Sequence, residues 1–262
     1  MRLSGSLRFP WRCFSKLIRE LRGGCLLNKV TDRREQARIV IADPFLPVSF
    51  HVGENAKFIL KGRLTFASFQ GLREIIYLNL ARDSSLIIDG NFNLGPGCRI
   101  DVARGGHLYI GGQRDESLSG VTERSRIMVR ERVHIGADLV CSWGAFITDS
   151  DWHDMVGHRT TEETVIGDHV WITPNCSILK GSRIGNGCIL ASGSVTHRAS
   201  FPDGCLVGGV PARVLAANRK WNRDMAINPK PALAGITDRE APWLPTSSIE
   251  SLCRPRRRGQ SC

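Results

Sequence analysis

A strict six-residue ladder between Ile166 and Val195 is the feature that most constrains how this chain folds. In steps of six the segment runs IGDHVW, ITPNCS, ILKGSR, IGNGCI and LASGSV. An amphipathic helix repeats its apolar residues every three or four positions and a half-buried strand every two, so neither explains this period. A period of six is typical of a parallel β-helix, in which each hexapeptide forms one short flat side. Three such sides predict a coil of about eighteen residues, whose large aliphatic residues stack from one coil to the next.

The ladder reserves two places in each six for the core. The first place holds a large aliphatic residue and the fifth place holds a small or medium one. The first places are Ile166, Ile172, Ile178, Ile184 and Leu190, and the fifth places are Val170, Cys176, Ser182, Cys188 and Ser194. Five aliphatic residues in register make chance repetition a poor explanation. We therefore predict an all-β chain built around a parallel β-helix.

Weaker sixes and short β segments extend this pattern along the chain. Segments typical of strands begin at Arg38, and sixes are visible from Leu94. The polar stretch 111–126 has no period, which predicts either a loop or an imperfect coil that contains a loop. The register returns at Val129 and shifts by one residue after Val195, which implies one more small loop. The extent of these strand segments and repeats predicts a β-helix domain over residues 38–215.

Residues 1–37 are predicted to form a separate basic segment with an amphipathic helix. Apolar residues recur at helical spacing from Trp11 to Leu21 with basic residues between them, and Gly23 and Gly24 are expected to stop the helix. Two interpretations of this helix are open. Residues 7–22 can lie on an anionic membrane surface as a peripheral contact, or the helix can cover the open end of the β-helix.

Residues 216–262 are predicted to hold a short closing helix at 216–224 and an irregular tail rich in proline and arginine. The net charge of +11 is concentrated in the last nine and the first 38 residues. An anionic membrane or a polyanionic small molecule would complement such charge. Nucleic acid is disfavoured, because arginine and aromatic residues do not interleave in a binding motif.

Targeting signals are not evident in the sequence. No run of 18 apolar residues is present, so we expect no transmembrane helix. Arginines and Glu20 interrupt the apolar stretches near the N-terminus, which argues against a secretory signal. We expect a cytoplasmic protein, with the inner face of the membrane as a second location if the N-terminal helix binds lipid.

Nine cysteines are present, without a C-x-x-C pair or a Cys/His zinc spacing. Four of them occupy the fifth place of a six, namely Cys98, Cys176, Cys188 and Cys205. A free cysteine behaves as a small apolar residue at such a place. We predict reduced cysteines in the core, with a disulfide framework or a metal cluster as the alternatives.

The ladder is interrupted between Ile147 and Ile166, where DWHDMVGHRTTEE (151–163) is polar and holds few aliphatic residues. We predict a loop extruded from one corner of the coil, with the coil resuming near Thr164. Loops on a rigid scaffold often carry binding and catalytic residues.

Four motifs in fixed order resemble those of the hexapeptide-repeat acyltransferases. They are ITDSDWHD at 147–154, VWI at 170–172, ASGSV at 191–195 and GGVPARVL at 208–215. The first is similar to the maltose, galactoside and nodulation-type O-acetyltransferases and to sugar O-acetyltransferases of surface-polysaccharide pathways. The resemblance covers residues 129–215 well and 38–128 loosely. It implies a left-handed parallel β-helix, a homotrimer and acetyl-CoA as the acyl donor. We expect no metal ligands.

Two departures from the family pattern affect the cofactor end of the site. WITPN places Thr173 where the family often has glycine, and GGVPARV stands where GNPARV is commoner. Neither touches the histidine of the DSDWHDM stretch. They bear on individual cofactor contacts and not on the activity.

The resemblance implies transfer of an acetyl group from acetyl-CoA to a sugar hydroxyl, a reaction that needs a base. A neutral imidazole, with an ordinary pKa near 6.5, is suited to that role. His153 is the candidate base, and one of Asp149, Asp151 and Asp154 could fix its tautomer. The sequence does not select among the three. We take Asp151 as the candidate catalytic partner and assign Asp149, Trp152 and Asp154 to acceptor binding.

The cofactor site that the resemblance implies lies further along the chain. Trp171 should point outward, since Val170 and Ile172 point into the core, and would wall the pantetheine groove. The corner containing Ala191 and Ser192 would meet the pantetheine amides. The remaining candidates are Thr196, Arg198 and Arg213, with the two arginines as ligands of the CoA phosphates.

Two other functions on the same fold are alternatives. A γ-type carbonic anhydrase would bind zinc through three histidines, and His153 and His158 have a superficially suitable spacing. The candidates for a third ligand, His134 and His169, are poorly placed in the register. The other alternative is a non-catalytic β-helix scaffold, which the presence of His153 argues against. The acceptor is not readable; the basic N-terminal segment suggests a large or membrane-proximal glycan, as in capsule, exopolysaccharide or lipopolysaccharide assembly.

Overall fold

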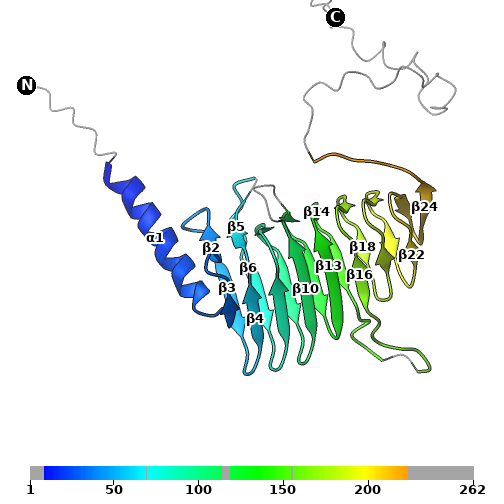
Figure 1. Cartoon of the computed structure of the whole chain (residues 1–262), viewed down its shortest axis with the longest axis horizontal. Coiled ribbons are helices and arrows are strands. Elements are labelled where there is room, and N and C mark those ends of the chain that lie inside the picture. Colours follow the sequence, from blue (N-terminus) through cyan, green and yellow to red (C-terminus); the bar gives the residue numbers. More distant parts are fainter. Residues whose placement is uncertain (1–8, 69, 114–118, 155, 224–262) are drawn as a thin grey trace, which may run out of the picture. The chain divides into compact units, whose positions relative to one another are not determined.

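The computed structural model describes residues 9–68, 70–113, 119–154 and 156–223, and within these ranges the side chains from residue 15 onward. The first compact unit of the chain ends at Trp221 and contains all of the strands described. Short strands wind around one core and form three sheets along its length (Figure 1).

Each complete coil contributes one strand to each of the three sheets; the last coil contributes one strand to the first sheet and one to the second, and β24 then returns along the second sheet. The first sheet contains β1 (Asp32–Arg33), β4 (Lys57–Leu60), β7 (Ser85–Ile88), β10 (His107–Gly112), β13 (Arg132–Ala137), β16 (Thr164–Ile166), β19 (Arg183–Ile184) and β22 (Ser200–Phe201). The second sheet contains β2 (Arg38–Ile41), β5 (Arg63–Phe66), β8 (Phe92–Leu94), β11 (Gly120–Val121), β14 (Val140–Cys141), β17 (Trp171–Ile172), β20 (Ile189–Leu190), β23 (Leu206–Gly209) and β24 (Ala212–Ala216). The third sheet contains β3 (Val48–Val52), β6 (Ile76–Leu80), β9 (Arg99–Val102), β12 (Arg126–Val129), β15 (Phe146–Thr148), β18 (Ser177–Ile178) and β21 (Val195–Thr196).

The register of these strands confirms the coil predicted from the six-residue period. Ile166 pairs with Ile184, and Ile172 pairs with Leu190, so equivalent residues are one coil of eighteen residues apart. The first-place aliphatic residues and all five fifth-place residues of the ladder are buried. The chain is therefore a parallel β-helix whose core is a stack of aliphatic layers, consistent with the left-handed coil that the resemblance implies.

The cysteines that the structure describes are free, and five of them lie in this core. Burial raises the pKa of the Cys98 thiol to about 11, and it also raises the pKa of Cys176 and Cys188. Thiols in such an environment act as small apolar side chains. The prediction of core cysteines is confirmed for these residues.

The N-terminal helix α1 (Phe9–Leu27) continues through the two glycines that were expected to stop it. A Cβ at Gly23 would lie 2.5 Å from the carbonyl oxygen of Ile39, so a side chain there would separate the helix from β2. Gly23 thus permits close packing and does not end the helix. The expected helix end was wrong, because the sequence does not distinguish these two uses of glycine.

Helix α1 packs beside β2 at the first coil, as Figure 1 shows. Arg19 donates to the carbonyl of Ala42 (3.1 Å), and Arg22 donates to the carbonyl of Leu46 (2.7 Å). These bonds support the interpretation of α1 as a cover for the first coil. Leu17 and Leu21 remain 52% and 61% exposed, so an outward apolar stripe is left for a partner.

None of the helices in the described ranges is long and apolar enough to cross a membrane.

The coil is continuous through the aperiodic stretch 111–126. Strand β10 runs to Gly112 and β11 starts at Gly120 in register with β8 and β14. Residues 114–118 lie outside the described ranges. Of the two predictions for this stretch, the described strands agree with a coil, and the predicted loop falls outside the described ranges.

The closing helix predicted for 216–224 is wrong over its described part, 216–223. The chain turns back after Gly209 and forms β24, which pairs antiparallel with β23. It then runs without helical structure to Trp221, whose indole stacks on His169 with ring centroids 4.0 Å apart. Pairing and this aromatic contact hold the segment extended, in place of local helix formation. The remaining tail lies outside the described ranges. The coil also begins slightly before residue 38, since β1 pairs with β4.

Candidate active site

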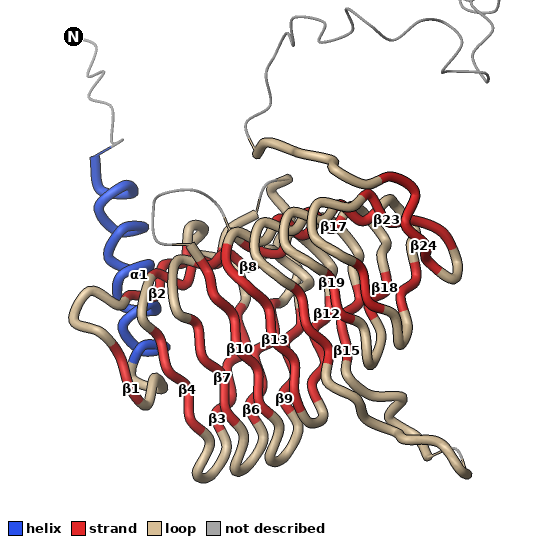
Figure 2. The backbone as a smooth tube through the Cα atoms, turned by 45° about the vertical axis from the view of Figure 1, so that its right-hand side comes forward, coloured by secondary structure: helices blue, strands red, loops and turns tan. Residues whose placement is uncertain are grey.

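The loop between β15 and β16 leaves the coil at the corner between the third and first sheets (Figure 2). Its two arms pair with each other at the base: the Asp151 N–H donates to the carbonyl of Thr160 (3.0 Å), and Ser150 and Thr161 form an antiparallel bridge. Beyond the loop the stacking resumes, because Ile135 pairs with Ile166. The predicted extruded loop is confirmed, and it does not disturb the register of the coil.

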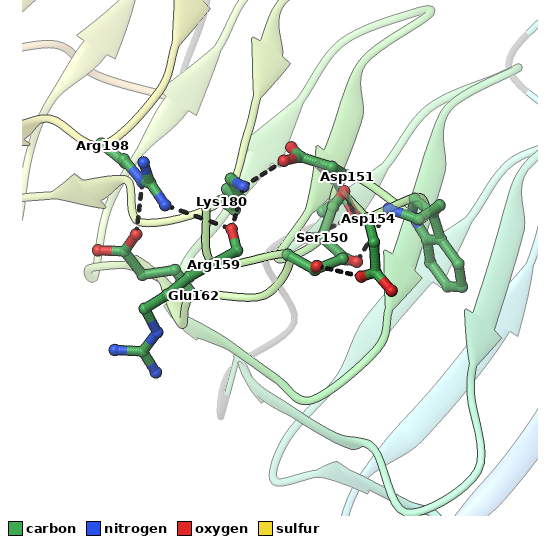
Figure 3. A network of polar contacts seen from close by, with 10 residues as sticks. Ser150, Asp151, Asp154, Arg159, Glu162, Lys180 and Arg198 are labelled. Carbon is green, nitrogen blue, oxygen red and sulfur yellow. Dashed lines mark hydrogen bonds and ion pairs between the residues drawn. The ribbon is translucent and has the colours of Figure 1, made fainter. Parts of the chain in front are cut away.

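A buried lysine from the next coil joins the two arms of this loop. The Lys180 side chain is only 2% exposed, and its ammonium donates to the carboxylate of Asp151 on one arm and to the carbonyl of Arg159 on the other. Figure 3 shows Lys180 between these two partners. A buried ammonium needs such acceptors, since its desolvation is otherwise costly. The base of the loop is therefore fixed to the coil.

A second cation, Arg198 from the following coil, also binds the base of the loop. Arg198 donates to the Glu162 carboxylate (2.7 Å) and to the carbonyl of Arg159 (3.3 Å). The Arg159 carbonyl thus accepts from two cations that belong to successive coils. Arg198 was predicted to bind a CoA phosphate, but the structure places its guanidinium against the loop.

The turn immediately before His153 is held by two hydrogen bonds. The Ser150 hydroxyl accepts from the Trp152 N–H (3.0 Å), and the Trp152 indole N–H donates to the Thr148 hydroxyl (3.2 Å). Trp152 has a φ of 64°, a left-handed conformation that a large aromatic residue rarely adopts. Such conformations persist where the surroundings enforce them, and they are found at functional sites.

His153 follows this turn with an exposed side chain. Its ring makes no hydrogen bond with any residue in the described ranges, whereas Trp152 and Asp151 on its N-terminal side are both anchored. Its backbone is thus positioned while its side chain is exposed. This arrangement suits a base that must accept a proton from an incoming hydroxyl.

Asp149 is buried at the end of β15 and cannot meet an acceptor. Its carboxylate accepts three hydrogen bonds from the backbone N–H groups of residues 130–132, at 2.6–2.7 Å. Burial raises the pKa of Asp149, and these hydrogen bonds oppose the rise. Its placement in acceptor binding is therefore corrected: Asp149 closes the corner between β12 and β13.

The other two aspartates also have partners other than the histidine. Asp151 is bound to Lys180, and Asp154 accepts from the hydroxyl of Thr160. Neither forms a hydrogen bond with His153 in this structure. Asp151 was the candidate catalytic partner of His153; the structure places its carboxylate on Lys180, as an anchor of the loop. Asp154 and Trp152 flank His153 on the same loop.

The expected cofactor residues near β17 and the following corner do lie on the surface. Trp171 is 37% exposed and points outward, with its ring centroid 5.9 Å from that of Trp221. Ser192 is exposed and its hydroxyl donates to the carbonyl of Pro174 (2.8 Å), next to the partly buried Ala191. Arg213 is exposed on β24.

Thr196 does not belong to this surface. Its side chain is buried in the coil and accepts from the Ser182 hydroxyl at 2.9 Å. The assignment of Thr196 to cofactor binding is corrected for this reason. The six-residue ladder already indicated that Thr196 is buried, because Thr196 follows Ile178 by one coil and pairs with it.

Within one chain, the structure does not bring the base and the expected cofactor residues together. His153 lies at the corner between the third and first sheets, Trp171 lies on the second sheet, and Ser192 lies at the corner between the second and third sheets. They belong to different sides of the coil.

The two histidines considered as the third zinc ligand are engaged elsewhere. His169 contacts Asp138 through Nδ1 and stacks on Trp221, and His134 stacks on Tyr109 with centroids 4.7 Å apart. Across the described ranges, no group of three or more His, Cys, Asp or Glu side chains is arranged to hold a metal ion.

Comparisons with known proteins agree with the six-residue repeat. The bacterial transferase hexapeptide family (six repeats) matches residues 163–198. WbbJ of Escherichia coli (strain K12), which carries the name of a lipopolysaccharide biosynthesis O-acetyl transferase, is 29% identical over 181 residues, or 63% of this chain and 86% of WbbJ. YvoF of Bacillus subtilis (strain 168), named as an acetyltransferase, is 30% identical over 89 residues, or 34% of this chain and 50% of YvoF.

Among solved structures, the polySia specific acetyltransferase NeuO aligns with a TM-score of 0.48 and 17% identity, over 75% of this chain and 90% of NeuO. That likeness is too low to bear on the acceptor. The repeat, its three-sided coil and the sequence matches lead to one assignment. Residues 163–198 carry the bacterial transferase hexapeptide repeat, and the chain is similar to acetyltransferases built on that repeat.

Proposed function

We propose that this protein transfers an acetyl group from acetyl-CoA to a hydroxyl of a sugar acceptor in surface-polysaccharide biosynthesis, with His153 as the general base. The similarity to WbbJ over most of that protein's length supports the reaction class. One observation carries the choice of base: His153 follows a turn pinned by Lys180 and Thr148, yet its own ring has no partner among the described residues.

The proposed chemistry needs no covalent enzyme intermediate. The neutral imidazole of His153 removes the proton from the acceptor hydroxyl as the oxygen attacks the thioester carbonyl. The C–O bond forms, the tetrahedral intermediate collapses with cleavage of the C–S bond, and the proton passes from His153 to the CoA thiolate. A backbone N–H at a glycine-rich corner is an economical donor to the oxyanion.

We place the complete site between copies of the chain, in a homotrimer. His153, Trp171 and Ser192 lie on different sides of one coil, so the base of one copy can face the cofactor groove of a neighbour. Arg213 is the exposed candidate for a CoA phosphate. Light scattering should give three copies per particle; a fully active monomer would contradict the shared site.

The catalytic assignment is tested by two substitutions in the same loop. His153→Ala should lower the rate of acetyl transfer by at least about 100-fold, the usual contribution of a general base. His158→Ala, further out on the loop, serves as the matched control and should stay close to wild type. Equal rates for wild type and His153→Ala would show that His153 is not the base.

A peripheral membrane contact through residues 7–22 is also part of the proposal. Leu17 and Leu21 form an exposed stripe on α1 beside Lys16, and an apolar stripe next to cations suits an anionic surface. Co-sedimentation with anionic liposomes should fall for Leu17→Ser/Leu21→Ser. Equal pelleting of this variant and wild type would exclude the contact.

A further inference from the structure

The outer face of the first sheet carries a chain of polar and aromatic groups that leads from the loop to a basic cleft. We propose that this surface, here called the glycan track, binds the non-reacting part of an anionic oligosaccharide or polysaccharide acceptor. The proposal rests on the proposed function and adds the charge and the minimum length of the acceptor.

The far end of the track is a cleft of about 550 Å³ at the corner between the first and second sheets. Four cations, Arg34, Arg38, Lys61 and Arg63, line it together with a single carboxylate, that of Asp89. Lys61 lies 3.0 Å and Arg34 lies 3.9 Å from the same Asp89 oxygen. Cations therefore outnumber the acid in the described lining, which favours an anionic ligand.

Two glycines in the lining of this cleft allow successive coils to pack closely. A Cβ at Gly62 would lie 2.4 Å from the carbonyl carbon of Gly90, and a Cβ at Gly90 would lie 2.7 Å from the backbone of Gln113. Side chains cannot fill the corner at these two positions without moving the coils apart.

A hydrogen bond connects this cleft to a second, shallower one. The Tyr109 hydroxyl donates to Asp89 (3.2 Å), and the Tyr109 ring stacks on His134 at an interplanar angle of 14°. Both rings line a cavity of about 360 Å³ on the outer face of β7, β10 and β13. Flat aromatic and imidazole faces with polar tips suit sugar rings, which also combine apolar faces with hydroxyls.

The second cavity ends at the base of the catalytic loop. Its lining includes Arg132 and Glu163, and Glu163 directly precedes β16. The neighbouring Glu131 accepts from Thr161 of the loop (2.7 Å). The track is therefore continuous from the loop, over Tyr109, to the basic cleft.

The strand spacing gives the length of this track. Between β16 at the loop and β4 beside Lys61, the first sheet has four strand-to-strand steps, or about 19 Å at the usual spacing. A single sugar held at His153 cannot reach the basic cleft. The cleft should hence affect only acceptors that are several sugar residues long.

Direct binding tests the track without any need for catalysis. The probe is polygalacturonate, a linear polysaccharide with a carboxylate on each sugar, and neutral dextran is the uncharged comparison. At low ionic strength wild type should bind polygalacturonate and not dextran, and added salt should weaken the binding. Arg34→Gln/Arg38→Gln should weaken it by about tenfold, the order expected from two exposed charge contacts.

A matched variant controls for the loss of charge. Arg73→Gln/Arg126→Gln also removes two positive charges, but from positions near the third sheet. This variant should bind polygalacturonate as wild type does. Unchanged binding by Arg34→Gln/Arg38→Gln, or an equal loss in both variants, would overturn the track.

The outcome can be separated from that of the proposed function. His153→Ala should bind polygalacturonate normally while failing in acetyl transfer. Normal transfer to short acceptors without polymer binding would leave the function standing and refute the track. Polymer binding that depends on Arg34 and Arg38, in a protein without acetyl transfer, would support the track and refute the function.

Discussion

The ammonium of Lys180, buried inside the coil, is paired with the carboxylate of Asp151, two residues before the candidate base His153. The same ammonium also binds the carbonyl of Arg159 on the returning arm. One side chain thus controls the separation of both arms and their distance from the core. We expect Lys180 to position His153 without touching the substrate.

Lys180→Met keeps the length of the side chain and removes its charge. Because the Asp151 carboxylate is 39% exposed and can be hydrated, the cost in unfolding free energy should be modest, roughly 1–2 kcal/mol. The kcat for transfer should fall at least about tenfold with little change in the KM for acetyl-CoA. Arg183→Met, which breaks only an exposed pair with Glu163, is the control and should leave kcat unchanged. A kcat near wild type in Lys180→Met would contradict the positioning role.

Asp151→Asn distinguishes an anchor from a direct partner of the imidazole. As an anchor, Asp151 should show energetic coupling to Lys180 of at least about 1 kcal/mol in a double-mutant cycle on kcat. The pH profile of the remaining activity should keep the midpoint of wild type. A shifted midpoint together with additive effects would show that Asp151 acts on His153 directly.

Two adjacent glycines in α1 offer a paired test of helix packing. Gly24→Ala meets no atom within 4 Å, so it should stabilise the protein by about 0.5–1 kcal/mol through helix propensity. Gly23→Ala meets the Ile39 carbonyl at 2.5 Å and should loosen α1. Thermal melting and hydrogen exchange over α1 would measure both. Equal effects of the two substitutions would argue against the observed packing.

Thr196→Val tests the corrected position of that side chain. Losing the hydrogen bond with Ser182 should cost about 1 kcal/mol of stability, while the KM for acetyl-CoA should not change. Arg213→Gln should do the reverse, raising that KM several-fold with no effect on melting. A higher KM in Thr196→Val would restore the original assignment to the cofactor site.

The core cysteines should resist thiol reagents between pH 7 and 9. This range lies below the pKa of Cys98, which burial raises to about 11, so the reactive thiolate stays scarce as the pH rises. In a native thiol titration Cys25→Ser should lower the count by one, since Cys25 is exposed. Cys98→Ala should leave the native count unchanged and lower only the denatured count. Rapid modification of Cys98 in the folded protein would contradict its burial.

The sequence predicted the coil well because its period is geometric. A stack of identical layers demands an aliphatic residue at every first place, and Ile166 and Ile184 meet as the sixes require. The same register predicts that Thr196 is buried, because Thr196 occupies the first place of a six, and it is buried in the structure. The error arose from following the family motif at a position where the ladder itself pointed inward.

The contacts around the base could not be predicted in the same way. Lys180 is buried because the loop folds over it, and its partners on the loop are 21 and 29 residues away. The left-handed conformation of Trp152 depends on bonds with Ser150 and Thr148 that no spacing rule encodes. Trp221 likewise reaches His169 across 52 residues. Such contacts depend on where an irregular segment settles, and periodicity carries no information about that.

The pairing of Ile135 with Ile166 has a consequence for how this kind of protein can change. The loop that carries His153 is an insertion between two coils. The coils on either side of it stack on each other as they would if the loop were absent. A loop of different sequence can occupy the same corner without a change in the coil, provided that its base still binds Lys180 and Arg198. Substitutions in the loop can then change the preference for an acceptor while the six-residue repeat of the coil stays the same.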